Sequence, residues 1–309
     1  MLTVLANGEA RDGAADARRV LVRGGTALDA VEAGIRQVED DEDVDSVARG
    51  GRPCLTGEVE CDAALMNGRT MEAGAVGALK GFLHPVSVAR RVMEVSPHVL
   101  LVGEGAVRFA REVDAEQAEI LTQERKAEFE QWLDEHVPAA QRGDWPGVPL
   151  AEHAWEAGRE LKRGGTAIML CIDRQGDIAA GTSSSGWAYG YPGRLGDSAV
   201  VGAGLYADNR YGACACTHFG EMTIRAVTAR TVVQALAHGE SVSGALSYAV
   251  RELRRLEGGF VGPVAVHAID FYGNPGVAST EDLGPEGSYM YWQEGMEEPA
   301  TGQAEVVPA

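Results

Sequence analysis

The sequence predicts an α+β protein in which two stacked antiparallel sheets lie between layers of helices, an αββα arrangement. Three observations lead to this prediction. Apolar, strand-like runs occur in both halves of the chain. Short turns separate most neighbouring strands, so hairpins outnumber strand–helix–strand units. Each half also contains segments with apolar residues at helical spacing. These features do not fit a doubly wound parallel sheet.

The composition excludes several classes of partner. The chain has 309 residues, of which 45% are hydrophobic and 24% charged, as in ordinary globular proteins. Its net charge of −19 argues against a nucleic-acid partner, which requires clustered Lys and Arg. No apolar run is long enough to span a membrane, and the first residues do not resemble a signal peptide. Five cysteines, an odd number in strand-like contexts, favour a reducing, cytoplasmic location.

The first third of the chain alternates strands and helices. Residues 2–6 predict a strand and residues 12–23 a helix that ends at Gly24–Gly25. The next helix begins with a capping box formed by Thr26 and Asp29, and an acidic loop ends it. The patterns then predict strands at 61–66 and 69–79 joined by a two-residue turn at Asn67–Gly68, a helix at 86–96, a strand at 98–103 and a helix at 104–112.

Residues 113–163 differ from the rest, because they are strongly charged and poor in apolar residues. We expect an exposed, partly mobile connector that contains some helix. Beyond it the patterns predict a hairpin of TAIMLCID and IAAGTSS, strands at 198–203, 211–217 and 262–270, and helices at 220–238 and 240–256. Cys214 and Cys216 face one side of a strand, at a spacing too tight for zinc. We expect buried thiols and neither a catalytic metal nor another cofactor.

Thr166 opens the first strand of that hairpin, directly after two glycines. A threonine hydroxyl is a weak nucleophile unless a base lies beside it. One such base is the threonine's own α-amine, with a pKa of about 7.7–8.0, which exists only when the threonine is the first residue of a chain. Cleavage of the bond after Gly165 would create it, and glycine tolerates the strained backbone that cleavage needs. The simpler interpretation is a glycine turn before a strand-favouring threonine.

Four residues downstream could serve such a nucleophile. Ser184 lies in the second strand of the hairpin, where it can face Thr166. Arg194 and Asp197 lie three apart in a glycine-lined turn and match the carboxylate and ammonium of a free amino acid. They could equally form a local surface ion pair. Thr217 ends a strand before a helix, where its hydroxyl and a backbone N–H could hold an oxyanion or simply cap the helix.

Several long segments together resemble a known family. GTAIMLCIDRQGDIAAGTSSSGW, YPGRLGDSAVVGAGLYADNRYGA and CTHFGEM are similar to the threonine N-terminal nucleophile (Ntn) hydrolases, which include glycosylasparaginase, plant-type asparaginase and isoaspartyl peptidase. RGGTALDAVEAG, CDAALMNGRTMEAGAVGAL, HPVSVARRVMEV and HVLLVGEGAVRFARE resemble the α-subunit of that family. The resemblance covers nearly the whole chain except about 113–163.

The resemblance implies one Ntn-hydrolase domain that cuts itself into chains 1–165 and 166–309. Family members have Asp or Gly before the nucleophile, so Gly165 fits. The implied roles are nucleophile for Thr166, support of the nucleophile for Ser184, binding of the substrate α-carboxylate for Arg194 and of its α-amine for Asp197, oxyanion stabilisation for Thr217 with the N–H of His218, and substrate contact for Ser46, His218 and Gly220. It also implies a homodimer of αβ units.

The sequence departs from the family pattern in three places. His218 replaces the first glycine of the usual T-G-x-G, and Arg49 adds a charge within SVARGG. Residues 6–8 replace a tryptophan found at the substrate cleft of some glycosylasparaginases. These departures put the leaving-group preference and the level of activity in question.

The resulting functional hypothesis is an autoprocessing amidohydrolase that cleaves the β-amide of a small asparagine derivative. Glycosylated asparagine is the first expectation, because Ser46 and SGWAYGYPGR look most like that branch; β-aspartyl dipeptides and asparagine follow. The alternative from another class is an uncleaved relative that binds an amino acid through Arg194 and Asp197 without catalysis. A nucleotide site at VGAGLYA is disfavoured, because it lacks a third glycine and a following long helix.

Overall fold

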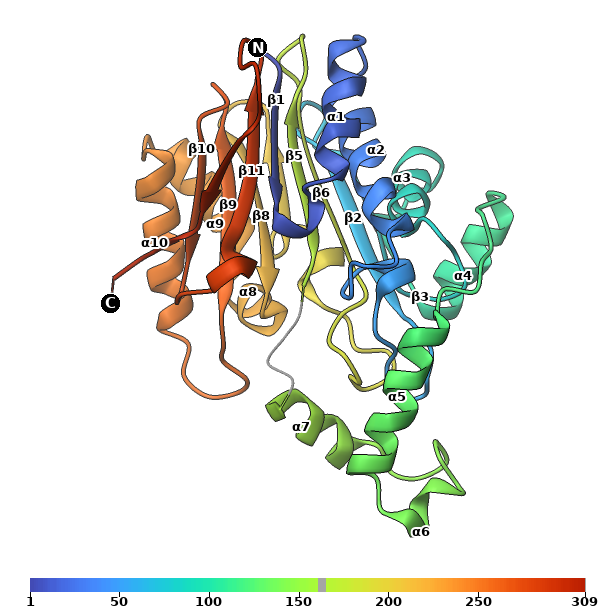
Figure 1. Ribbon diagram of the computed structural model, residues 1–309. Helices are drawn as coiled ribbons and strands as arrows, with labels where there is room; N and C mark the ends of the chain where they lie inside the picture. Colours follow the sequence, from blue (N-terminus) through green and yellow to red (C-terminus); the bar gives the residue numbers. More distant parts are fainter. Residues whose placement is uncertain (161–164, 309) are drawn as a thin grey trace.

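The computed structural model describes residues 1–160 and 165–308, which form an α+β fold with two mixed sheets (Figure 1). One sheet has eight strands in the order β12 (Ala300–Gln303), β11 (Ser288–Gln293), β1 (Thr3–Asn7), β5 (Ala167–Ile172), β6 (Ile178–Ser184), β2 (Cys61–Asn67), β3 (Ala73–Leu79) and β4 (Leu100–Val102). The other has five, in the order β13 (Glu305–Val306), β10 (Pro275–Ser279), β9 (Val264–Asp270), β8 (Gly212–His218) and β7 (Leu205–Asp208).

The helices lie on both sides of the sheets (Figure 1). Those on the side of the larger sheet are α1 (Gly13–Val22), α2 (Ala27–Asp40), α3 (Pro85–Val95) and α4 (Gly103–Glu112). Those on the side of the smaller sheet are α8 (Gly220–Ala226), α9 (Thr228–Ala237) and α10 (Val242–Arg254). The connector carries α5 (Gln123–His136), α6 (Ala139–Arg142) and α7 (Ala151–Glu160). Short 3₁₀ turns are η1 (Gly8–Ala10), η2 (Ala48–Gly50), η3 (Asp197–Ala199) and η4 (Gly284–Gly287).

Successive side chains of a strand point to opposite faces of its sheet, so they belong to separate hydrophobic cores. In β5, Ile168 and Leu170 join a core shared with Ala213 and Ala215 of the smaller sheet. The residues between them, such as Met169, pack against the helices α1 and α2 instead. In the same way, the thiols of β8 pack against α9 and α10. One face of each sheet therefore points toward the other sheet and the opposite face toward helices.

Most of the expected elements are confirmed, including the β5–β6 hairpin and the Thr26–Asp29 capping box at the start of α2. All five cysteines are buried and free, as expected. The antiparallel expectation holds for most strand pairs but is wrong at two edges, where β3–β4 and β10–β13 pair in parallel. The first exception follows from α3, because a helical crossover returns the chain in the same direction.

Three local expectations are wrong. The turn after β2 spans residues 68–72 rather than two residues, because the Asn67 side chain accepts hydrogen bonds from the backbone N–H groups of Arg69 and Thr70. The expected strand at 198–203 is replaced by η3 and a turn, and β7 begins later. The expected helix at 220–238 is divided at Val227, whose φ of 49° is left-handed. The strands beyond residue 270 were not expected.

The connector is more structured and less exposed than expected. Its helices α5 and α7 bury Phe129, Trp132 and Ala157 in a small core with Leu55 and Tyr189. Trp132 and Tyr189 have ring centroids 4.7 Å apart. Aromatic burial of this kind holds α5 against the loop that follows β6. Residues 161–164, the expected end of the connector, lie outside the described residues. Within the described residues, no helix is both long and apolar enough to span a bilayer.

Glu39, near the end of α2, is a fully buried carboxyl group between α2, α3 and β6. Its Oε1 accepts hydrogen bonds from the Ser183 hydroxyl at 2.6 Å and from the Val86 N–H at 3.0 Å. Burial raises the pKa of Glu39 from 4.5 to about 8, although both donors oppose that rise. The folded protein therefore holds this proton more tightly than the unfolded chain does.

This difference predicts a pH-dependent stability. Because the unfolded chain releases the Glu39 proton first, the free energy of unfolding should fall as pH rises from about 4.5 through about 8. Glu39→Gln keeps an oxygen that can accept from Ser183 and removes the titration. Thermal melts at pH 5, 6.5 and 8 should show a smaller loss of melting temperature in the variant than in the wild type. Parallel pH profiles would contradict this assignment.

Candidate active site

Thr166 is a buried residue at the entrance to β5. The antiparallel register pairs Ala167 with Ser183, so Thr166 lies beside Ser184 at the end of β6. The Ser184 hydroxyl donates to the carbonyl oxygen of Gly165 at 2.9 Å and accepts from the Gly186 N–H at 2.9 Å. Ser184 is thus held against the peptide bond that precedes Thr166, where its hydroxyl polarises the carbonyl.

Asn7, at the end of β1, fixes the other side of the same segment. Its side chain donates to the Thr166 carbonyl oxygen at 2.7 Å and accepts from the Ile168 N–H at 3.0 Å. The amide thus continues the strand pairing where the regular ladder between β1 and β5 ends. The sequence indicated nothing about Asn7 except that residues 6–8 stand where some glycosylasparaginases have a tryptophan. Its role depends on the β1–β5 pairing, which joins residues far apart in the chain.

Thr217 lies near the end of β8 in the smaller sheet, and its side chain is on the face that points toward the larger sheet. Ile168 and Ala215, each two residues along from the two threonines, both belong to the core between the sheets. Because alternate residues share a face, Thr166 and Thr217 both point toward the space between the sheets. The structure thereby places three hydroxyl groups, those of Thr166, Ser184 and Thr217, on the inner faces of β5, β6 and β8.

His218 covers the hydroxyl of Thr217. Its φ of 81° lies in the region that favours glycine, which is the usual residue in the motif it departs from. The ring Nδ1 is 2.7 Å from the Thr217 Oγ, and Nε2 is 3.5 Å from a Glu286 carboxylate oxygen. The side chain is only 6% exposed. The ring therefore occupies space beside the oxyanion candidate rather than turning into solvent.

Arg194 and Asp197 do not form the local ion pair that was the simpler interpretation. The Arg194 guanidinium makes a two-pronged pair with Glu221, at 2.9 and 2.8 Å, and lies 4.9 Å from the Trp187 ring centroid. Asp197 is buried and accepts from the Thr223 hydroxyl at 2.6 Å. Burial raises the pKa of Asp197 to about 6, against the effect of the Thr223 hydroxyl and the Arg194 charge.

Gly220, at the start of α8, allows Asp197 to approach closely. A Cβ at Gly220 would lie 2.7 Å from the Asp197 Oδ1 and 2.9 Å from its backbone nitrogen, inside contact distance. The sequence expected Gly220 to contact substrate directly. In the structure the absence of its side chain makes room for the carboxylate.

Asp62 anchors the loop that carries Arg194. This β2 residue is buried, and its two oxygens accept from the N–H of Ala78 at 2.9 Å and of Gly196 at 2.8 Å. Burial raises the pKa of Asp62 to about 6, opposed by both N–H donors and by the Arg194 charge. No local sequence signal indicates this role, because the partners of Asp62 lie at Ala78 and Gly196, outside its own strand.

A cavity of about 140 Å³ opens beside the Gly165 peptide. It is lined by Glu9, Asp45, Ser46, Arg52, Gly165, Gly186, Ala188 and Glu286. Ser46 thus lines the same cavity as Gly165, whereas Arg49 pairs with Glu42 at 2.8 Å in a half-exposed position. Glu9 was not expected from the sequence. No group of three or more possible metal ligands occurs among residues 1–160 and 165–308.

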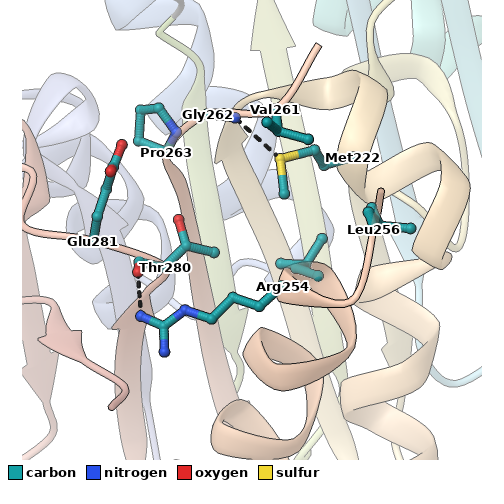
Figure 2. Close-up of a pocket in the computed structure, with 9 residues that line it drawn as sticks. Met222, Arg254, Leu256, Val261, Gly262, Pro263, Thr280 and Glu281 are labelled. Atoms are coloured by element: carbon teal, nitrogen blue, oxygen red, sulfur yellow. Dashed lines mark hydrogen bonds between the residues drawn. The ribbon is translucent and has the colours of Figure 1, made fainter. Parts of the chain in front are cut away.

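A second, separate cavity of about 340 Å³ lies at the end of α10, between Met222 of α8, the segment that precedes β9 and the residues that follow β10 (Figure 2). Figure 2 shows the Arg254 side chain hydrogen-bonded to the Thr280 carbonyl oxygen, and the Gly262 N–H is 3.3 Å from the Met222 sulfur. None of the expected site residues lines this cavity. Two of the expected residues, Ser46 and Gly165, line the smaller cavity instead.

Comparisons with known proteins agree on one family. A family profile described as Asparaginase matches residues 9–282. The N(4)-(beta-N-acetylglucosaminyl)-L-asparaginase of Elizabethkingia miricola is 38% identical over 243 residues, 78% of this chain and 66% of that protein. The plant-type L-asparaginase of Pyrococcus horikoshii is 38% identical over 91% of this chain and 88% of its own length. The isoaspartyl peptidase of Salmonella typhimurium is 35% identical, covering 92% and 86%.

The anchoring role of Asp62 can be measured as stability. Asp62→Ala would leave two buried N–H donors without an acceptor, at a cost of roughly 2–5 kcal/mol in the free energy of unfolding. Asp62→Asn retains one acceptor oxygen and should lose clearly less. Urea unfolding of both variants and the wild type provides the measurement. Equal stability of wild type and Asp62→Ala would show that the loop does not depend on this carboxylate.

Proposed function

Because the chain belongs to the asparaginase family, we propose that it is an autoprocessing amidohydrolase that cleaves the β-amide of asparagine derivatives. The observation that carries this proposal is the environment of Thr166. It is a buried threonine after a glycine whose carbonyl accepts from Ser184, with Thr217 on the inner face of the opposite sheet.

The first step is self-cleavage. The Thr166 Oγ attacks the Gly165 carbonyl carbon, which the Ser184 hydroxyl polarises. The C–N bond breaks, and water hydrolyses the resulting ester between Gly165 and Thr166. The products are chains 1–165 and 166–309, and the second begins with a free α-amine on the nucleophile.

The second step is hydrolysis of the substrate amide. The Thr166 α-amine takes the hydroxyl proton as Oγ attacks the side-chain carbonyl of the substrate. The Thr217 hydroxyl and the N–H of His218 stabilise the tetrahedral oxyanion, a contribution worth on the order of 3 kcal/mol per donor in comparable sites. The amine leaves with a proton from the α-ammonium. Water then attacks the β-aspartyl ester and releases aspartate.

Charged groups on the loop after β6 would hold the amino-acid head of the substrate. Arg194 would bind the α-carboxylate once Glu221 moves away, because the guanidinium binds carboxylates in the same two-pronged manner. Asp197 would receive the α-ammonium beside Gly220. Ser46 would contact the substrate from the cavity wall.

Glycosylated asparagine remains the first choice of substrate, supported by the name and identity of the Elizabethkingia relative. Isoaspartyl peptides and asparagine are the alternatives, which two other relatives carry in their names. We also propose that the two sheets and outer helices form the four-layer αββα sandwich of this family, that two αβ units form a homodimer, and that the protein is cytoplasmic.

The proposed function is tested by one comparison. Purified protein should give two bands on a denaturing gel, the smaller beginning TAIML, and should release aspartate from at least one of glycosylasparagine, a β-aspartyl dipeptide and asparagine. Thr166→Ala should remain one full-length chain and release none, because the hydroxyl is missing from both steps.

A non-catalytic amino-acid-binding relative is the rival function, favoured by the His218 ring beside the Thr217 hydroxyl. It predicts a single full-length band after long incubation and aspartate binding without hydrolysis. That result would refute the amidohydrolase.

His218 should limit activity rather than support it. Its ring engages the Thr217 hydroxyl, which the reaction needs for the oxyanion, and fills space beside the backbone N–H. His218→Gly fits the left-handed backbone and should raise kcat/KM for aspartate release several-fold. His218→Ala removes the ring and keeps the unfavourable φ, so it separates the two effects. A fall in kcat/KM in both variants would mean that the imidazole assists catalysis.

A further inference from the structure

Glu9 occupies the place where a side chain on Gly165 would lie. A Cβ at Gly165 would overlap the Glu9 Oε1 and the Ser46 Oγ. The pairing of β1 with β5 produces this contact, since the chain that leaves β1 through Asn7 passes the chain that enters β5 at Thr166. A carboxyl group from the start of the sequence thus lies beside the proposed cleavage bond.

The surroundings of Glu9 favour its protonated form. Burial raises the pKa of the Glu9 carboxyl above its ordinary value. The charge of His218, the Ser46 hydroxyl and the backbone N–H of Thr166 oppose that rise, and Asp45 adds to it. The Thr166 N–H donates to this carboxyl, which places Glu9 next to the nitrogen that must leave during self-cleavage. The Glu9 Oε2 is buried and has no hydrogen-bond partner among the described residues, so this oxygen can hold the proton.

Resting on the self-cleavage proposed above, we infer that Glu9 is the acid that protonates the Thr166 nitrogen as the Gly165–Thr166 bond breaks. The Gly165 residue cannot supply such a group, because it has no side chain. Glu9 lies against Gly165 and accepts from the N–H of the leaving nitrogen, so it would act as a catalytic residue of processing.

The reaction uses Thr166, Ser184, Glu9 and water, and no other reactant. The Oγ–C bond forms as the Thr166 hydroxyl proton passes to water, and the carbonyl electrons move to the oxygen that Ser184 contacts. When the C–N bond breaks, its electron pair remains on nitrogen, which takes the Glu9 proton. Glu9 is left as a carboxylate beside a neutral amine. Water then hydrolyses the ester, giving the Gly165 carboxyl group and a free Thr166 hydroxyl.

Replacement of Glu9 by glutamine tests the inference directly. Full-length chain made by cell-free synthesis and followed on denaturing gels gives the cleavage rate, and N-terminal sequencing identifies the product. Glu9→Gln should slow cleavage by about 100-fold or more, the usual contribution of a general acid. Asp12→Asn, which removes an exposed charge three residues along the same segment, should cleave at the wild-type rate.

The pH dependence provides a readout that a structural role would not change. Wild-type cleavage should slow as pH rises through the raised pKa of Glu9, because the acid form is lost, and Glu9→Gln should lose that dependence. The charged groups around Glu9 are His218 on β8 and Asp45 after α2, together with Arg52 and Glu286, which line the same cavity. Glu286 also faces His218 from η4. The same profile measured in His218→Gln should keep the wild-type slope with a shifted midpoint.

A second variant separates folding from chemistry. Glu9→Ala leaves space beside the bond, and added acetic acid should accelerate its cleavage. An uncut, folded Glu9→Ala that acetic acid does not rescue would overturn the inference. Wild-type cleavage rates in Glu9→Gln, with the product beginning TAIML, would overturn it as well and leave the proposed function intact. A wild-type chain that never cleaves would overturn both.

Discussion

The antiparallel pairing of β5 with both β1 and β6 is the constraint on which the whole site depends. On one side the register brings Ser184 to the Gly165 carbonyl, and on the other it brings Asn7 to the Thr166 carbonyl. A one-residue slip in either pairing would turn Thr166 from the space between the sheets toward the helices. Because both faces of β5 are apolar and buried, the alternation pattern alone does not fix this register; the contacts of Asn7 and Ser184 and the packing of individual side chains do.

Close packing around one peptide bond follows from this register. The chain segments that flank Gly165 approach until only a glycine fits, since a Cβ would overlap Glu9 and Ser46. Most polar groups beside this bond are paired within the fold, such as the Gly165 carbonyl with Ser184, whereas the Glu9 Oε2 and the Ser46 Oγ are buried without a hydrogen-bond partner. Asp62 extends the same principle to the loop of Arg194, where its carboxylate satisfies two backbone donors. Ser184 and Asn7 are thus held by contacts with the backbone, whereas Arg194 and Asp197 are held by the side chains of Glu221 and Thr223.

Patterns of residues close together in the sequence predict part of this structure correctly. The Thr26–Asp29 cap, the β5–β6 hairpin and the helices α1 to α4 depend on residues close in the chain, and they could be predicted. Glu9 and Asp62 could not, because their partners lie at residues 165–166 and 196 and are met only through strand pairing. The connector was predicted to be exposed from its charge, whereas a few widely spaced aromatic residues decide its packing. The average composition of the connector does not reveal such residues, because they are few and far apart.

Glu221 and His218 each occupy a candidate binding group of the full-length chain, Glu221 at Arg194 and His218 at Thr217, and they differ in how easily they can move away. Glu221 holds Arg194 through two charge-assisted hydrogen bonds, but its side chain is 33% exposed and can rotate into water. A substrate carboxylate replaces it without changing the charge beside the guanidinium. His218 has no such freedom, because its left-handed backbone and its contacts with Thr217 and Glu286 fix the ring. Under the proposed function, exchange at Arg194 would govern how tightly an amino-acid head binds, whereas His218 would limit how closely the scissile amide approaches Thr217.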